Sequence, residues 1–219
     1  MKEMNIKVDK EIKKVKKSLL REIMEWFFCI IAAFVLAITI KYFFFTPTLV
    51  QQTSMTPTIL DGQRVLINRT VRTFNLPIYR GDIITFERPI DTDVEKGIGI
   101  YKDENTVVYT LLHDVLEMGK ISYIKRVIGT AGDHVLIKGG NVYVNDMKLE
   151  EVYLPEDTDT PKRGDFYDLI VPEGYIFVMG DNRGGSSDSR EFGCIPLDKV
   201  EGRVTYRIWP LSAFGKIDK

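Results

Sequence analysis

The sequence contains few of the residues on which thiol and metal chemistry depend, with two cysteines and two histidines in 219 residues. Cys29 falls inside a long apolar run and Cys194 in the polar part that follows, so they are not expected to meet and no disulfide framework is predicted. His113 and His134 show neither metal-ligand spacing nor the neighbourhood of a histidine-based catalytic triad. The sequence therefore predicts no metal and no cofactor.

An excess of positive charge is also missing, because the chain as a whole carries a formal net charge of −1. After residue 45 there are 21 Lys and Arg against 26 Asp and Glu, and no basic patch with interleaved aromatic residues occurs there. Nucleic-acid-binding domains depend on such a patch to meet the phosphate backbone. The composition thus argues against nucleic acid as a partner.

One long apolar run breaks the otherwise ordinary composition. Residues 26–45 read WFFCIIAAFVLAITIKYFFF and carry one charge, Lys41, near the end. A helix of this length matches the roughly 30 Å hydrocarbon core of a bilayer, and a lysine near its end can reach the headgroups. A buried core helix is rarely apolar on every face, and a cleaved signal peptide would be followed by a small-x-small site. The run is predicted to be an uncleaved transmembrane anchor.

Residues 1–25 carry eight Lys and Arg against five Asp and Glu. The positive-inside rule places this segment in the cytoplasm and everything after the span on the outer face of the cell membrane, with a single pass. Ile12, Val15, Leu19 and Ile23 recur at helical spacing. The basic stretch is therefore either an amphipathic helix on the cytoplasmic leaflet or a solvated tail.

Residues 46–219 are predicted to form one extracytoplasmic all-β domain, built from antiparallel sheets or a partly closed barrel. Gly139-Gly140 can supply the positive φ of a two-residue hairpin turn. Residues 89–120 and 146–166 are interpreted as excursions, each with an Asp-x-Asp pair that could bind a cation or form a solvated turn. The expected strands, rich in Val, Ile, Tyr and Phe, are 64–68, 82–87, 106–112, 122–128, 134–138, 141–145, 167–171, 175–180 and 204–208.

Ser54 lies in the stretch QQTSMTPT, residues 51–58, soon after the apolar run ends. Pro57 fixes its own φ and biases Thr56 toward extended geometry, so the serine lies in or beside a rigid, extended segment. Taken alone, a serine near a proline is more typical of a turn.

A lysine in an apolar strand is the second informative feature. Within SYIKRVIG, residues 122–129, Lys125 shares a face with Tyr123, while Ile124 and Arg126 lie on the other face. Burial would disfavour the charged form and lower the pKa of Lys125, which leaves a neutral amine able to take a proton from a serine. The alternative is a lysine that extends into solvent at a sheet edge.

The third feature is a polar loop, GDNRGGSSDSREFG, at residues 180–193, directly after the apolar segment YIFVM. Its density of Gly, Asp, Asn and Ser is typical of a polar turn in which Asp and Arg satisfy one another. It could equally form the floor of a site, with hydroxyls and ion pairs that fix a neighbouring side chain.

Together, these three stretches resemble the type I signal peptidases, which are membrane-anchored serine proteases with a Ser/Lys dyad. The matching motifs occur in the family's order behind an N-terminal span and cover the chain from about residue 47 to 210. A single span in a chain of this length is similar to the Gram-positive-like members. The motifs are Ser54-Met55-x-Pro57-Thr58, Gly81-Asp82-Ile83-Ile84, Tyr123 to Gly129 with Gly132-Asp133, and Gly180-Asp181-Asn182-Arg183 through Ser186-x-Asp188-Ser189-Arg190 to Phe192-Gly193.

The resemblance implies that Ser54 attacks the scissile carbonyl and that Lys125 acts as general base and then protonates the leaving amine. Ser186 would hydrogen-bond the lysine and orient it, and the backbone N–H of Ser54 would form part of the oxyanion hole. Gln52 stands where family members carry a hydroxyl side chain or glycine, so its amide either donates to the oxyanion or points away. Structural support would come from Arg126, Asp181, Asn182, Asp188 and Arg190, four of them as ion-pair partners.

The family's substrates are exported preproteins with small residues at positions −1 and −3, bound as an added extended strand. By resemblance, the shallow pockets for these residues would be lined by Leu49, Val50, Met55, Tyr123 and Ile124. The lipid bilayer is the other expected partner, and the sequence gives no indication of oligomeric state.

Three other classes are weighed against this one. The self-cleaving repressors are soluble and carry a DNA-binding segment, which the span and the acidic domain oppose. A sortase needs a cysteine with a histidine, and Cys194 has no histidine in view. A catalytically silent, membrane-tethered β-domain that binds peptides or partners is opposed by the presence of both Ser54 and Lys125.

Overall fold

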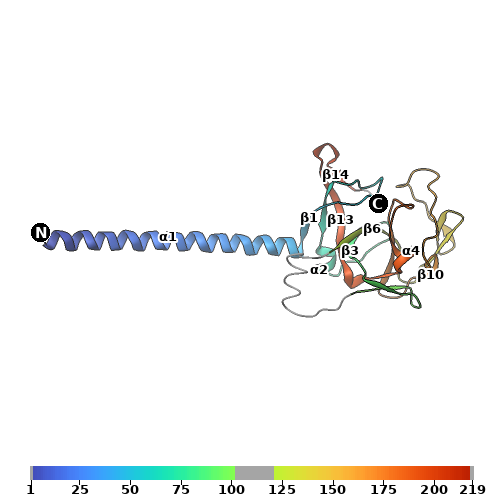
Figure 1. The fold of residues 1–219 in the computed structure, drawn as a ribbon, viewed down its shortest axis with the longest axis horizontal. Helices are drawn as coiled ribbons and strands as arrows, with labels where there is room; N and C mark the ends of the chain where they lie inside the picture. The colour runs from blue at the N-terminus through green and yellow to red at the C-terminus, as the bar shows by residue number, and fades with distance from the viewer. Residues whose placement is uncertain (1, 102–120, 218–219) are drawn as a thin grey trace. The chain divides into compact units, whose positions relative to one another are not determined.

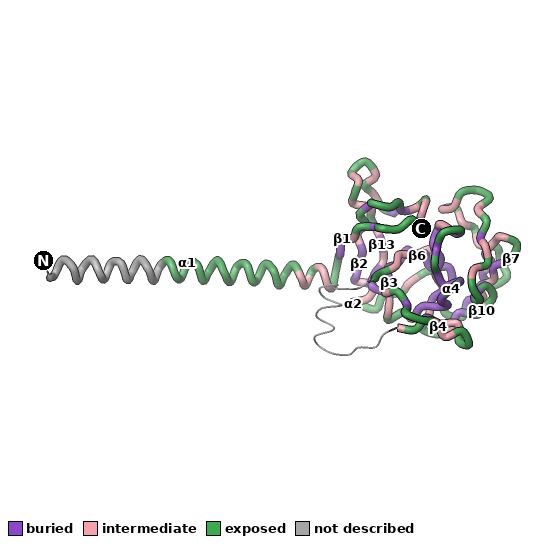
Figure 2. The backbone as a smooth tube through the Cα atoms, viewed as in Figure 1, coloured by how far each residue is buried: buried purple, intermediate pink, exposed green. Residues whose placement is uncertain are grey.

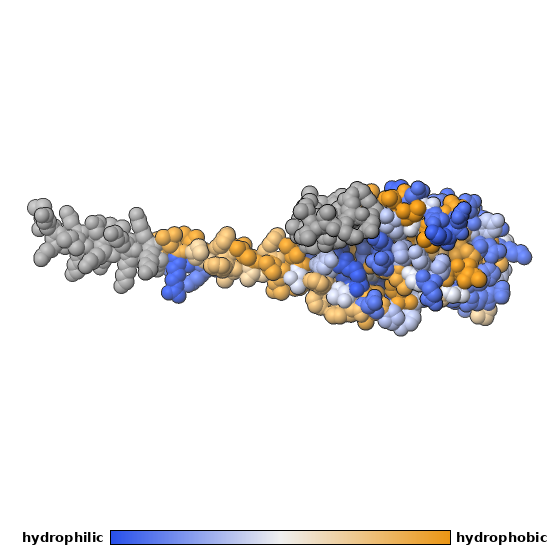
Figure 3. Space-filling view, turned by 90° about the horizontal axis from the view of Figure 1, so that it is seen from below, coloured by the Kyte–Doolittle hydropathy of each residue, from blue (hydrophilic) through white to orange (hydrophobic). Residues whose placement is uncertain are grey.

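The computed structural model describes the backbone of residues 2–101 and 121–217, with side chains from residue 19 onward in those ranges. It divides into two compact units, residues 1–41 and 42–219. Helix α1 (Lys2–Phe43) contains the stretch Leu19–Phe43, which is long and apolar enough to cross a membrane and is not buried. Figure 3 shows apolar side chains along it.

The helix ends two residues before strand β1 (Phe45–Leu49) begins, so the apolar run at 26–45 is divided between two elements. Thr46 precedes Pro47, and a residue before proline is driven out of helical geometry. Proline also lacks an N–H for a central strand but is tolerated on an edge, which is where β1 lies.

The second unit is built around one curled antiparallel sheet with the strand order β1-β2-β13-β3-β6-β11-β12, and β14 pairs with β13 (Figure 1). Register shifts occur where β13 meets β2 and β3 and where β11 meets β6. Such bulges bend a strand and increase its twist, which curls the sheet. The bounds are β2 (Arg64–Asn68), β3 (Ile83–Glu87), β6 (Ser122–Thr130), β11 (Tyr175–Met179), β12 (Ile195–Pro196), β13 (Val200–Trp209) and β14 (Gly215–Lys216).

A smaller antiparallel sheet has the order β10-β7-β8-β9, and β4 and β5 form a separate ribbon. Short helical turns complete the unit. The bounds are β4 (Asp91–Asp93), β5 (Ile98–Ile100), β7 (His134–Lys138), β8 (Asn141–Val144), β9 (Met147–Lys148), β10 (Asp168–Ile170), α2 (Thr70–Thr73), α4 (Ser189–Phe192), η2 (Leu197–Lys199) and η3 (Leu211–Ala213).

The predicted fold class is confirmed: the domain is all-β and antiparallel, with one N-terminal apolar helix. Gly139 and Gly140 have φ of 57° and 77° and join β7 to β8, as the hairpin requires. The expected strand at 106–112 and His113 lie outside the described residues. Among the side chains that the structure describes, no group of three potential metal ligands occurs.

Buried residues concentrate in the curled sheet and its neighbours, while residues 19–37 of α1 are exposed (Figure 2). One apolar cluster lies under the β1–β2–β13 side of the sheet and contains Met55 and Ile59. A second cluster contains Ile84 and Val127 from adjacent strands β3 and β6. These clusters fix the two segments that carry the predicted nucleophile and base.

Candidate active site

Ser54 lies five residues beyond the end of β1 and is 8% exposed. Its neighbour Met55 is 1% exposed in the core, and the N–H of Ile59 donates to the Met55 carbonyl at 2.9 Å. The Ser54 carbonyl accepts a 3.0 Å hydrogen bond from the Asn182 N–H, and the Asn182 side chain donates to the Thr53 carbonyl at 3.2 Å. The position of the serine is thus fixed by its neighbour in the apolar core and by hydrogen bonds to the polar loop at 180–193.

Lys125 lies in the middle of β6, and its Nζ is 2.9 Å from Ser54 Oγ. The lysine is 1% exposed, and Nζ also donates to the Ile124 carbonyl at 3.1 Å. Burial lowers the pKa of Lys125 to about 8, against the opposing pull of Asp188 and Asp181. The amine therefore loses its proton around pH 8 instead of above pH 10, at hydrogen-bond distance from a hydroxyl that it can deprotonate.

Ser186 is fully buried beside the nucleophile loop, but its contacts differ from the predicted one. Among the described residues its Oγ has no hydrogen-bond partner, so the expected bond to Lys125 is not formed. Gly180 is what allows this close approach: a Cβ there would lie within 3 Å of both Ser186 Oγ and the Ser54 carbonyl oxygen. The loop packs so tightly against the nucleophile that only glycine fits.

The four predicted ion-pair residues form two buried pairs. Arg126 meets Asp181 through two hydrogen bonds of 2.9 and 2.8 Å, with both side chains fully buried. Arg190 meets Asp188 through two bonds of 2.8 Å, also fully buried. An oxygen of Asp188 further accepts from the Gly180 N–H at 3.0 Å. The Arg126–Asp181 pair ties the 180–193 loop to β6, the strand that carries the lysine, and the Arg190–Asp188 pair braces the loop internally.

The 146–166 excursion contributes a further layer of contacts that was not predicted from the sequence. The Tyr153 ring stacks on the Arg126 guanidinium at 3.6 Å, and its hydroxyl donates to Glu151 at 2.7 Å. Glu151 in turn pairs with Arg183, whose side chain is fully buried. Burial, and then Glu151, raise the pKa of Tyr153, which keeps its hydroxyl a donor. Only the charge pattern EEVY could have indicated these contacts.

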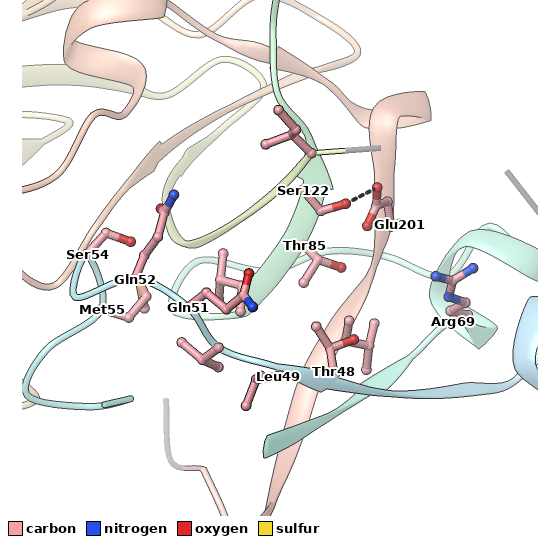
Figure 4. Close-up of a pocket in the computed structure, with 14 residues that line it drawn as sticks. Thr48, Leu49, Gln51, Gln52, Ser54, Met55, Arg69, Thr85, Ser122 and Glu201 are labelled. Atoms are coloured by element: carbon pink, nitrogen blue, oxygen red, sulfur yellow. Dashed lines mark hydrogen bonds between the residues drawn. The ribbon is translucent and has the colours of Figure 1, made fainter. Parts of the chain in front are cut away.

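A cleft of about 350 Å³ reaches the nucleophile from the side of β1 and β6 (Figure 4). Four of the five residues predicted for substrate binding line it, namely Leu49, Val50, Met55 and Ile124. A second cleft of about 390 Å³ lies on the other side of the dyad and is lined by the fifth, Tyr123, together with Lys125 and Ser187. Gln52 lines both clefts next to Ser54.

The far end of the first cleft carries polar side chains that the sequence did not indicate. Figure 4 shows Ser54 at one end and Ser122, Thr85, Glu201 and Arg69 at the other. The Ser122 hydroxyl donates to Glu201 Oε1 at 2.8 Å. Glu201 lies on β13, far from β6 in the sequence, so no spacing rule could have connected the two.

The chain is similar to known proteins in sequence and, over part of its length, to a solved structure. A family model described as signal peptidase, peptidase S26, matches residues 23–209. A signal peptidase I of Bacillus licheniformis is 37% identical over 90% of this chain and 94% of its own length. A signal peptidase IB of Staphylococcus aureus (strain COL) is 34% identical over 89% of this chain and 93% of its own. A crystal structure of a signal peptidase I from Enterococcus faecalis is 29% identical, covers 59% of this chain and 97% of that one, and superposes with a TM-score of 0.39.

Proposed function

The chain belongs to the signal peptidase family of serine peptidases, peptidase S26, and we propose that it cleaves preproteins with Ser54 as nucleophile and Lys125 as general base. Membership makes it an endopeptidase that removes signal peptides from preproteins. The observation that carries the dyad assignment is the 2.9 Å approach of Lys125 Nζ to Ser54 Oγ, with both side chains buried.

In the proposed reaction the neutral Lys125 amine takes the proton of Ser54 Oγ while that oxygen attacks the scissile carbonyl. The backbone N–H of Ser54 donates to the oxyanion, with the Gln52 amide as a second donor from the mouth of the cleft. The protonated lysine then gives its proton to the leaving amine. A water attacks the acyl-enzyme by the same route and restores the free serine.

Ser186 is proposed to orient the lysine, although its hydroxyl has no hydrogen-bond partner among the described residues. The serine is fully buried, and a Cβ on Gly180 would meet both its Oγ and the Ser54 carbonyl oxygen, so it lies close to the nucleophile segment. The proposed role requires its hydroxyl to move to the Lys125 amine.

The substrate is proposed to bind as an extended strand in the first cleft. Among the described strands, β1 pairs only with β2, so its other edge is open. Strand β6 pairs with β11 only from Arg126 onward, so its first residues are open on the edge that does not face β3. Two backbone edges therefore flank the cleft, both running toward the dyad, and an extended peptide can hydrogen-bond to them. Leu49, Val50, Met55 and Ile124 would present the apolar walls of shallow pockets at −1 and −3.

The anchor is proposed to cross the membrane once, with the basic N-terminal segment in the cytoplasm and the β-domain on the outer face. The candidate span Leu19–Phe43 and the charge balance of the flanking segments support this orientation. Enzyme and signal peptide then share one bilayer, and the cleavage site meets the cleft at its outer surface. The lipid bilayer is thus the second proposed partner.

The test is cleavage of a preprotein by the full chain in proteoliposomes, comparing wild type with Ser54→Ala and Lys125→Ala. Wild type should cut once after a small-x-small site, and both variants should lose at least 100-fold in rate because nucleophile and base are removed. Ser187→Ala, an exposed serine in the second cleft, is the matched control. Near-normal cleavage by Lys125→Ala would place the base elsewhere, and an inactive wild type would favour a silent binding domain.

A further inference from the structure

We propose that Ser122 and Glu201 make this enzyme prefer a residue that carries a hydroxyl, Ser or Thr, at position −3 of the preprotein. The inference rests on the proposed function, because it concerns the substrate of the same site. The end of the cleft that carries Ser122 and Glu201 plays no part in the cleavage chemistry. We assign to it the selection of the small residue at −3.

The observation is a hydrogen bond at the wall of the cleft. Ser122 is exposed at the start of β6, and its hydroxyl donates to Glu201 Oε1 at 2.8 Å. Glu201 is 4% exposed and comes from β13, and its carboxyl group lies beyond Ser122 on the side away from Ser54 (Figure 4). Thr85, 1% exposed, lines the same end and directs its hydroxyl toward the Gly202 carbonyl at 3.5 Å.

A serine hydroxyl has one proton and two lone pairs. Because the Ser122 proton is donated to Glu201, the oxygen can only accept a hydrogen bond from anything that enters the cleft. A substrate hydroxyl supplies the matching donor. An apolar side chain of the same size would exclude water from this oxygen and leave its lone pairs without a donor, which costs free energy that the Thr hydroxyl would recover.

The alternation of side chains along a strand indicates which substrate residue Ser122 faces. Ser122 and Ile124 are two residues apart on one face of β6, and both line the cleft. Positions −1 and −3 of an extended peptide are also two residues apart on one face. In the proposed binding mode the peptide runs parallel to both cleft edges, with its −1 residue nearest the dyad. With Ile124 opposite −1, near the nucleophile, Ser122 lies opposite −3.

The two charges at this end offset one another. Arg69 and Glu201 line the same part of the cleft and are each 4% exposed, so their opposite charges favour a neutral side chain of the substrate. The volume of the whole cleft, about 350 Å³, also has to hold several residues of an extended peptide. Ser and Thr meet both the size and the hydrogen-bond requirement.

The experiment measures kcat/KM of the full chain in detergent micelles for two peptides that differ only at −3, where one carries Thr and the other its isostere Val. Wild type should prefer Thr by about three- to tenfold, the ratio that one neutral hydrogen bond supports. Ser122→Ala should bring the Thr/Val ratio to about one. Ser187→Ala, a serine in the second cleft, should leave the ratio at the wild-type value.

A second variant addresses the role of Glu201 as a positioning residue. Glu201→Gln keeps the shape of the side chain, but its amide can donate to Ser122 and free the serine proton toward the cleft. The Thr/Val ratio should fall below the wild-type value even if Ser122→Ala does not fold. A structural role alone would lower both rates together and leave the ratio unchanged.

The outcomes separate the two proposals. If wild type cleaves both peptides at the same site with equal kcat/KM, or prefers Val, the −3 assignment is wrong while the peptidase function stands. If the ratio favours Thr but survives in Ser122→Ala and Glu201→Gln, the assignment to these residues is wrong. If wild type cleaves neither peptide nor any preprotein, the proposed function fails and takes this inference with it.

Discussion

The rate of cleavage should rise with pH through a midpoint near 8, because the proposed base must be neutral to accept the serine proton. Burial lowers the pKa of Lys125 from its usual 10.5 to about 8. At pH 7 roughly one lysine in ten is then neutral, against about one in three thousand with the usual pKa. The fold therefore raises the fraction of competent base roughly 300-fold, which corresponds to about 3 kcal/mol.

The assay is kcat/KM between about pH 6 and 10, with a peptide that has no group titrating in this range, because kcat/KM reports the pKa of the free enzyme. Asp61→Asn is the matched control: this exposed acid lines the second cleft beside the dyad but is not among the causes of the lysine's shift. It should leave the midpoint in place. A profile that is flat from pH 6 to 9, or that still rises above pH 10, would refute the desolvated-lysine mechanism.

Three other variants test the same structure. Gly180→Ala should reduce cleavage by at least about tenfold, because a Cβ there meets the nucleophile's carbonyl oxygen, whereas Gly184→Ala has open space and should cleave normally. Lys125→Met should be more stable than wild type at pH 7, by chemical denaturation in detergent. The pKa of Lys125 is lower in the folded state than in the unfolded state, so the free energy of unfolding of wild type rises between about pH 8 and 10.5. The difference in stability between Lys125→Met and wild type should therefore shrink by about 3 kcal/mol over this range. Glu151→Ala strips a buried arginine of its carboxylate and should cost roughly 3 kcal/mol, while Glu191→Ala breaks a half-exposed pair at 3.6 Å and should cost under about 1 kcal/mol.

The strands that sequence could predict were those with strong local signals. The segment at 134–144 carries both β-branched residues and a Gly-Gly turn, and its hairpin forms as expected. Strand β1 (Phe45–Leu49) was missed because its first residue, Phe45, is the last residue of the apolar run that predicts the span. The signal that separates them is Pro47, which ends the helix but is also compatible with an edge strand.

The dyad and its ion pairs could be predicted because they lie in short motifs, but the side chains that surround them could not. Glu201 reaches Ser122 across 79 positions, and Tyr153 stacks on Arg126 from an excursion that had no assigned role. Contacts of this kind depend on how the curled sheet brings distant segments together. Local periodicity carries no information about them, so the Ser122–Glu201 bond on which the proposed −3 preference rests became visible only in the structure.

The electrostatic environment of Lys125 explains why the nearby carboxylates, Asp188 and Asp181, are each paired with an arginine. A bare carboxylate roughly 4 to 8 Å away would favour the protonated amine by on the order of 2 to 4 kcal/mol, as much as burial contributes in the other direction. Asp188 and Asp181 both act on the lysine in this sense, yet burial prevails. Each is bound through two hydrogen bonds to a fully buried arginine, Arg190 or Arg126. The paired arginine cancels most of the field of its acid at the amine, so the two ion pairs hold the loop in place without keeping the base protonated.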